Sequence, residues 1–162
     1  MPAPPAVPTP RSLARLQRAV ARLVADIGAD LVRARARLRA VDVRRKGVGD
    51  FVTSVDLRAE RRLRRTLAQW LPTAGFLGEE TPPHELDRDL VWVVDPIDGT
   101  SNFANGLPHF AVAVALLAAR TPVLAAIHAY PEDATYTARA GGGARRNGRR
   151  LRCPDGQVDD GG

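Results

Sequence analysis

The chain has 162 residues and a mass of 17.5 kDa, which suits one domain with a sizeable core and is too short for two. Its 44% hydrophobic and 26% charged residues are typical of a globular protein and argue against disorder throughout. The longest apolar run, Phe110 to Ala119, is too short to cross a bilayer, so we expect no membrane partner. A single cysteine, Cys153, excludes an internal disulfide and fits the reducing cytoplasm, where we expect the chain to act.

The net charge of +6 is unevenly distributed along the chain. Residues 1–72 carry 16 basic and 6 acidic side chains, whereas residues 73–135 carry 2 basic and 9 acidic ones. Carboxylates concentrated in a cationic chain indicate a cation site.

The basic residues leave a second class of function open, that of a nucleic-acid-binding module. Two arginine clusters of the chain suggest this class, Arg33/Arg35/Arg37/Arg39 and Arg61/Arg62/Arg64/Arg65. Both clusters fall on expected helices whose opposite face is apolar, and neither is interleaved with aromatic residues. We therefore favour solvated helix faces, and nucleic acid is not favoured as a partner.

The first elements in chain order are a lead and two helices. Five prolines among the first ten residues predict a disordered lead over 1–11. Apolar residues at three- and four-residue steps predict a long amphipathic helix over about 12–40. A short strand, a glycine-rich turn and an extended segment are expected in succession over 41–54, before a second helix over 56–70.

The hydrophobic period then changes to that of strands. Strands are expected over 75–78, 90–95, 110–117, 123–130 and 134–139, and Asn147-Gly148 predicts a type I′ hairpin turn. The segment 153–162 lacks a core-forming pattern and is expected to be an unstructured tail. The fold class is therefore α+β, with two N-terminal helices packed on a largely antiparallel sheet in a domain over 12–152.

The most informative segment is WVVDPIDGTSNF at 92–103. Asp95 follows a buried strand, and Asp98 comes three residues later beyond a proline bend, so the two carboxylates can converge on hard cations. Gly99 permits an unusual backbone conformation, and Thr100 can begin a short helix whose amides receive a phosphate. Such a set suits metal-assisted phosphoester hydrolysis. From spacing alone, a surface Asp-Pro turn with a capped helix explains the segment equally well.

Flanking motifs distinguish between these two interpretations, the hydrolysis site and the surface turn. They are Gly78-Glu79-Glu80, GDFVTSVD at 49–56, NGLPHF at 105–110, Tyr136-Thr137-Ala138-Arg139, Gly143-Ala144 and Asn147-Gly148. Together with the Asp-Pro-Ile-Asp-Gly-Thr core, they make residues 12–152 resemble the inositol monophosphatase family, in unbroken family order. The resemblance implies a sugar-phosphatase-like layered fold.

The resemblance also implies a metal site. Glu79, Asp95 and the backbone carbonyl of Ile97 match the ligands of a first Mg²⁺ ion, and Glu79 is also counted among the catalytic residues. Asp95 would bridge to a second Mg²⁺ ion that Asp98 also holds. Mn²⁺ is the alternative metal.

Further roles in catalysis follow from the same resemblance. Asp56 and Thr100 match the pair that orients and deprotonates the attacking water. The backbone amides of Gly99 and Thr100 match the phosphate donors. Lys46 is matched to the lysine of the family's active-site loop, although it lies one residue closer to Asp50 than the family pattern expects.

The implied function is Mg²⁺-dependent hydrolysis of a small phosphorylated substrate, such as myo-inositol monophosphate or a similar polyol phosphate, by in-line attack of water on phosphorus. Family members that hydrolyse histidinol phosphate, fructose 1,6-bisphosphate or 3′-phosphoadenosine nucleotides share the same motifs and remain open as alternatives. A non-catalytic, truncated remnant that binds Mg²⁺ weakly is a further alternative.

One family feature is missing from this sequence. Family members continue with a second half, whose Trp-Asp-x-Ala-Ala-Gly segment completes the second metal site and whose side chains select the substrate. We expect that absence to lower metal affinity and impair activity. It would also leave one apolar face of the sheet without cover, and a homodimer or other self-association is then expected.

Overall fold

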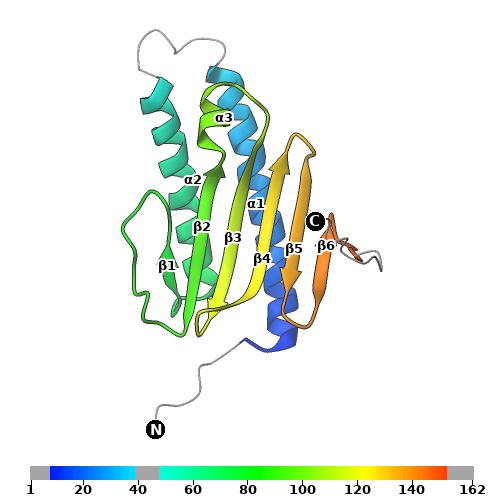
Figure 1. Cartoon of the computed structure of the whole chain (residues 1–162). Coiled ribbons are helices and arrows are strands. Elements are labelled where there is room, and N and C mark those ends of the chain that lie inside the picture. Colours follow the sequence, from blue (N-terminus) through cyan, green and yellow to red (C-terminus); the bar gives the residue numbers. More distant parts are fainter. Residues whose placement is uncertain (1–7, 39–47, 153–162) are drawn as a thin grey trace, which may run out of the picture.

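The structure, a computed structural model, describes residues 8–38 and 48–152. Two long helices, α1 (Pro10–Leu38) and α2 (Val48–Trp70), precede a seven-stranded sheet, and a short helix, α3 (Thr100–Ala104), follows the second strand (Figure 1). The strands are β1 (Gly75–Leu77), β2 (Leu90–Asp98), β3 (Phe110–Ala118), β4 (Thr121–Tyr130), β5 (Ala134–Arg139), β6 (Gly143–Arg146) and β7 (Arg149–Arg150).

The strands lie in the sheet in chain order. β1 and β2 pair in parallel, and every other neighbouring pair is antiparallel. The α+β class and the largely antiparallel sheet are thus confirmed.

Helix α1 begins at Pro10, two residues before the expected start. The Ser12 amide donates to the Thr9 hydroxyl at 3.3 Å, and proline is well suited to the first helical position. The expected strand over 41–45 and Lys46 lie outside the described residues.

Helix α2 corrects the prediction for the segment before Asp56. The backbone is helical from Val48, so the glycine-rich turn does not continue to residue 50 and residues 51–54 are not extended. Val55, Ala59, Leu63 and Leu67 are buried at four-residue steps. An extended segment was expected at 51–54, but packing of this apolar stripe on the core favours the helix.

Strand β2 is longer than predicted, because it continues through Pro96 to Asp98. The pairing register with β3 shifts between Asp95 and Asp98. Proline cannot donate to the ladder, so the strand remains paired on either side of an irregularity. Farther along, positive φ angles of 49° at Asn147 and 79° at Gly148 agree with the expected type I′ turn.

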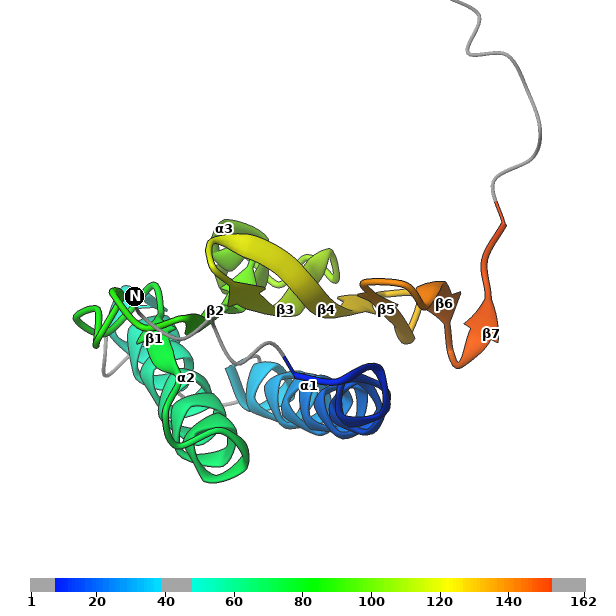
Figure 2. The ribbon, with the colours of Figure 1, turned by 90° about the horizontal axis from the view of Figure 1, so that it is seen from below.

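Both long helices cover the same face of the sheet (Figure 2). The core between these layers includes the fully buried Trp92, Leu116 and Leu124. The alternate residues of the strands face away from α1 and α2, and among them Ala113 pairs with Ile127, whose side chain is 42% exposed. Over β3 and β4 this outward face is apolar, as the sequence predicted.

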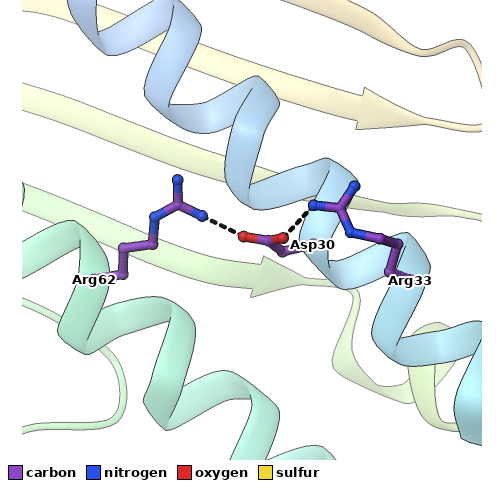
Figure 3. Close-up of polar contacts among 3 residues, drawn as sticks. All are labelled: Asp30, Arg33 and Arg62. Atoms are coloured by element: carbon purple, nitrogen blue, oxygen red, sulfur yellow. Dashed lines mark hydrogen bonds and ion pairs between the residues drawn. The ribbon is translucent and has the colours of Figure 1, made fainter.

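Asp30 of α1 joins the two long helices. Its carboxylate accepts from Arg33 of the same helix and from Arg62 of α2 (Figure 3). Asp30 is half-exposed, so we assign this network only about 0–1 kcal/mol per pair. Two further cluster members lie over aromatic rings, Arg35 over Phe110 and Arg64 over Phe76. These contacts give part of the arginine clusters a structural role.

Across the parts of the chain that the structure describes, neither long helix has an apolar stretch sufficient to span a bilayer.

Candidate functional site

Helices α2 and α3 and the ends of β1 and β2 lie close together at one end of the sheet (Figure 1). Asp56 lies on α2, Glu79 and Glu80 follow β1, and Asp95 and Asp98 lie at the end of β2. Because β1 and β2 are parallel, their carboxyl ends reach the same edge of the sheet. The topology therefore places carboxylates that are far apart in sequence beside one another.

Of the predicted site residues that the structure describes, Asp56 is the most buried after Ile97. Its side chain is 2% exposed, and its Oδ1 atom is buried without a hydrogen-bond partner. Burial first, and then the negative charges of Glu80, Asp95 and other nearby carboxylates, raise the pKa of Asp56 to about 7. A carboxylate with a pKa near neutrality can accept and release a proton at physiological pH.

Asp95 responds to its neighbours in the same way. Burial first, and then the charges of Glu79 and Asp98, raise the pKa of Asp95 to about 6. The Ile97 amide donates to Asp95 Oδ1 at 3.0 Å, which favours the ionised form and opposes that shift. The structure thus brings together four of the acidic residues that the sequence singled out: Asp56, Glu79, Asp95 and Asp98.

The turn between β2 and α3 has the conformation expected for an exposed helix start. Gly99 has φ 90° and ψ 37°, in the left-handed region, and a Cβ there would lie 3.0 Å from the His109 carbonyl oxygen. The first amides of α3 have no intrahelical acceptor, as at every helix start.

The hydroxyl of Thr100 donates to the Ile97 carbonyl at 2.9 Å. A threonine hydroxyl has one proton, so that proton is not shared with Asp56 in this arrangement. The oxygen lone pairs of Thr100 remain able to accept a hydrogen bond.

Glu60 is a residue of this region that the sequence analysis missed. Its side chain is 0% exposed, and its Oε2 atom accepts the Glu80 amide at 2.7 Å. A Cβ placed on Gly78 would lie 2.4 Å from the Glu60 Cδ atom, so the backbone before Glu79 rests directly on this carboxylate. Its spacing was the available signal, because Glu60 follows Asp56 by one helical turn within an apolar stripe.

The carboxylates of this region are the type of ligand that a hard divalent cation requires, although their side chains do not surround a single position. Within residues 8–37 and 54–152, no group of three acidic, histidine or cysteine side chains is arranged closely enough to hold a metal ion. The carboxylates nevertheless raise one another's pKa, and the Oδ1 atom of Asp56 is buried without a partner. A cation would relieve both penalties, and oxygen ligands are what Mg²⁺ and Mn²⁺ prefer.

Comparison with known proteins identifies close relatives of this arrangement. The model of the inositol monophosphatase family matches residues 13–160. An inositol-1-monophosphatase of Rhizobium meliloti is 44% identical over 126 residues, which are 77% of this chain and 47% of that protein. A fructose-1,6-bisphosphatase/inositol-1-monophosphatase of Aquifex aeolicus is 31% identical over 137 residues, covering 84% of this chain and 52% of that one.

A solved structure shows the same fold. The native structure of the extragenic suppressor protein suhB from Bartonella henselae matches with a TM-score of 0.74 and 34% identity, over 85% of this chain and 54% of that one. The chain therefore spans about half the length of the relatives it matches.

Proposed function

We propose that this chain, which belongs to the inositol monophosphatase family, takes part in the metal-dependent hydrolysis of phosphomonoesters in the cytoplasm. The favoured substrate is a small polyol phosphate such as myo-inositol monophosphate. The observation that carries the proposal is the proximity of the buried Asp56 and the half-buried Asp95 to the exposed Glu79 and Asp98, beside the Gly99–Thr100 turn. An acidic group next to unpaired amides can hold cations and a phosphate together.

Glu79, Asp95 and the Ile97 carbonyl would hold one Mg²⁺ ion, and Asp95 and Asp98 would hold a second. Bound Mg²⁺ would lower the pKa of a water molecule and neutralise charge on the phosphate. The register shift between Asp95 and Asp98 supports this assignment, because it changes the direction of the chain between the two carboxylates.

Asp56 would take the proton from the attacking water. It is suited to this role because it is buried beside the other carboxylates and its Oδ1 atom has no hydrogen-bond partner within the chain. Thr100 would accept a hydrogen bond from the same water, since its own proton is donated to Ile97. The two residues would then orient the water without contacting each other.

The amides of Gly99 and Thr100 would receive the phosphate oxygens. Gly99 supports this role because its left-handed conformation turns the chain from β2 into α3. The carbonyl of His109 accepts from Asn102 of α3 at 2.8 Å, which holds the following loop against the turn.

The test is phosphate release from a substrate panel in the presence of Mg²⁺ or Mn²⁺. The panel contains myo-inositol 1-phosphate, fructose 1,6-bisphosphate, histidinol phosphate and a 3′-phosphoadenosine nucleotide. We expect myo-inositol 1-phosphate to be the best substrate and Asp95→Asn to abolish its hydrolysis. Asp26→Asn, on the exposed surface of α1, is the matched control and should retain activity.

Three results would decide against parts of this proposal. Phosphate release that survives Asp95→Asn would refute the site. A strong preference for fructose 1,6-bisphosphate, the substrate in the name of the Aquifex aeolicus relative, would refute the polyol monophosphate assignment. Calorimetric binding of Mg²⁺ without turnover of any panel member would identify a non-catalytic chain.

A further inference from the structure

A second concave region lies toward the opposite edge of the sheet from the carboxylates. A groove of about 530 Å³ runs between α1 and the strands β5 and β6. The carboxylate site is at β1 and β2, and strands β3 and β4 separate it from this groove (Figure 1). The groove is therefore distinct from the proposed phosphatase site.

The charged residues that line the groove are all arginines. Arg18 and Arg22 come from successive turns of α1, Arg139 from the end of β5, and Arg145 from β6. Within the described part of the chain, none of these four arginines forms an ion pair. Four guanidinium groups around one groove, with no carboxylate in its lining, give a strongly positive local potential.

The floor of the groove is polar and fixed. Gln17 of α1 and Thr137 of β5 are buried, and the Gln17 Nε2 atom donates to the Thr137 hydroxyl at 3.1 Å. Thr137 pairs with Arg145 in the sheet, so both side chains lie on the face toward α1. Small residues of α1, Ala14, Ala21 and Ala25, line the helix side.

Two of the guanidinium groups are positioned by the backbone. Arg145 donates from Nη1 to the Gly148 carbonyl at 3.0 Å. Arg139 lies over Gly142, where an added Cβ would be 2.5 Å from its Cζ atom. Holding side chains in place before a ligand arrives reduces the entropy lost on binding.

We propose that this groove binds a small ligand with two or more linked phosphate groups. Guanidinium groups match phosphate oxygens in pairs, and several arginines favour a ligand that carries several negative charges. The groove has the size of a typical small-molecule site. Its lining contains no aromatic ring on which bases could stack, which disfavours single-stranded nucleic acid as the occupant.

The test uses the full chain and inorganic tripolyphosphate in isothermal titration calorimetry, with EDTA present. Chelation removes divalent ions, so the carboxylate site repels the probe. We expect saturable binding that Arg18→Gln/Arg22→Gln weakens about tenfold or more. The matched control is Arg61→Gln/Arg65→Gln, which removes two exposed arginines at the same spacing on α2 and should change affinity by less than about twofold.

Other outcomes would overturn the proposal. They are the absence of binding to the unmodified chain, equal weakening by both arginine pairs, or equal weakening by Asp95→Asn in the other site. A single-stranded oligonucleotide that binds more tightly than tripolyphosphate would also overturn it, in favour of nucleic acid. Circular dichroism checks that each variant is folded, and the single variant Arg145→Gln provides the test if the α1 pair does not fold.

Discussion

Gly78→Ala tests the contact that supports the acidic segment after β1. The new methyl group would lie 2.4–2.5 Å from the Cδ and both carboxylate oxygens of Glu60, which is too close for any packed atom pair. Glu60 is fully buried and accepts the Glu80 amide, so its carboxylate cannot move without breaking that bond. The segment that carries Glu79 would therefore shift.

The magnitude follows from these contacts. A hydrogen bond to a charged group contributes about 1.5–3 kcal/mol, and overpacking costs about 1–3 kcal/mol. We expect a loss of about 3 kcal/mol in the free energy of unfolding. For a chain of this size, this corresponds to a fall of about 6–12 °C in Tm.

Urea unfolding followed by circular dichroism measures this loss directly, and phosphate release reports the displacement of Glu79. The double variant Gly78→Ala/Glu60→Asp provides the partner control, because the shorter side chain makes room for the methyl group. We expect the two changes together to cost less than the sum of each alone. A Gly78→Ala protein as stable as the unmodified chain, or strictly additive changes, would refute this account.

Three further predictions concern other parts of the molecule. Gly99→Ala should lower phosphate release about tenfold or more and reduce the free energy of unfolding by about 1–3 kcal/mol. The reason is that φ is 90° at Gly99 and the new Cβ would approach the His109 carbonyl. Unchanged kinetics would contradict this prediction. Burial lowers the pKa of His128 in the folded protein, so this histidine becomes protonated at a higher pH in the unfolded chain than in the folded one. The free energy of unfolding should therefore fall as the pH drops below about 6.5. Urea unfolding at pH 7.5 and 5.5 should show a smaller loss for His128→Gln, and identical losses would exclude His128 as the cause. Light scattering should detect self-association through the outward sheet face, reduced by Ile127→Glu; a monodisperse unmodified monomer would refute this.

Local sequence patterns predicted much of this fold. Strand β3 alternates between buried and half-buried residues along its whole length, and its apolar run was recognisable as a strand. The residues from Asp95 to Thr100 are close in sequence, so their juxtaposition depends on one turn. Such features need no knowledge of distant contacts.

Features that depend on distant contacts were missed. The first residues of α2 resemble a strand locally, and the buried stripe from Val55 onward shows why a helix is favoured. Glu60 has an evident role only when β1 brings the Glu80 amide to it. The arginines of the groove come from α1 and from β5–β6, and only the packing of that helix on the far strands brings them together.

The order of the strands has a consequence for synthesis of the chain. Each strand lies beside the one made just before it, so the sheet can grow by successive additions at one edge as the chain leaves the ribosome. Helix α1 is made before β3, β4 and β5, yet its apolar side packs on these strands. During that interval the helix has an exposed apolar stripe, which is the kind of surface that chaperones bind on nascent chains.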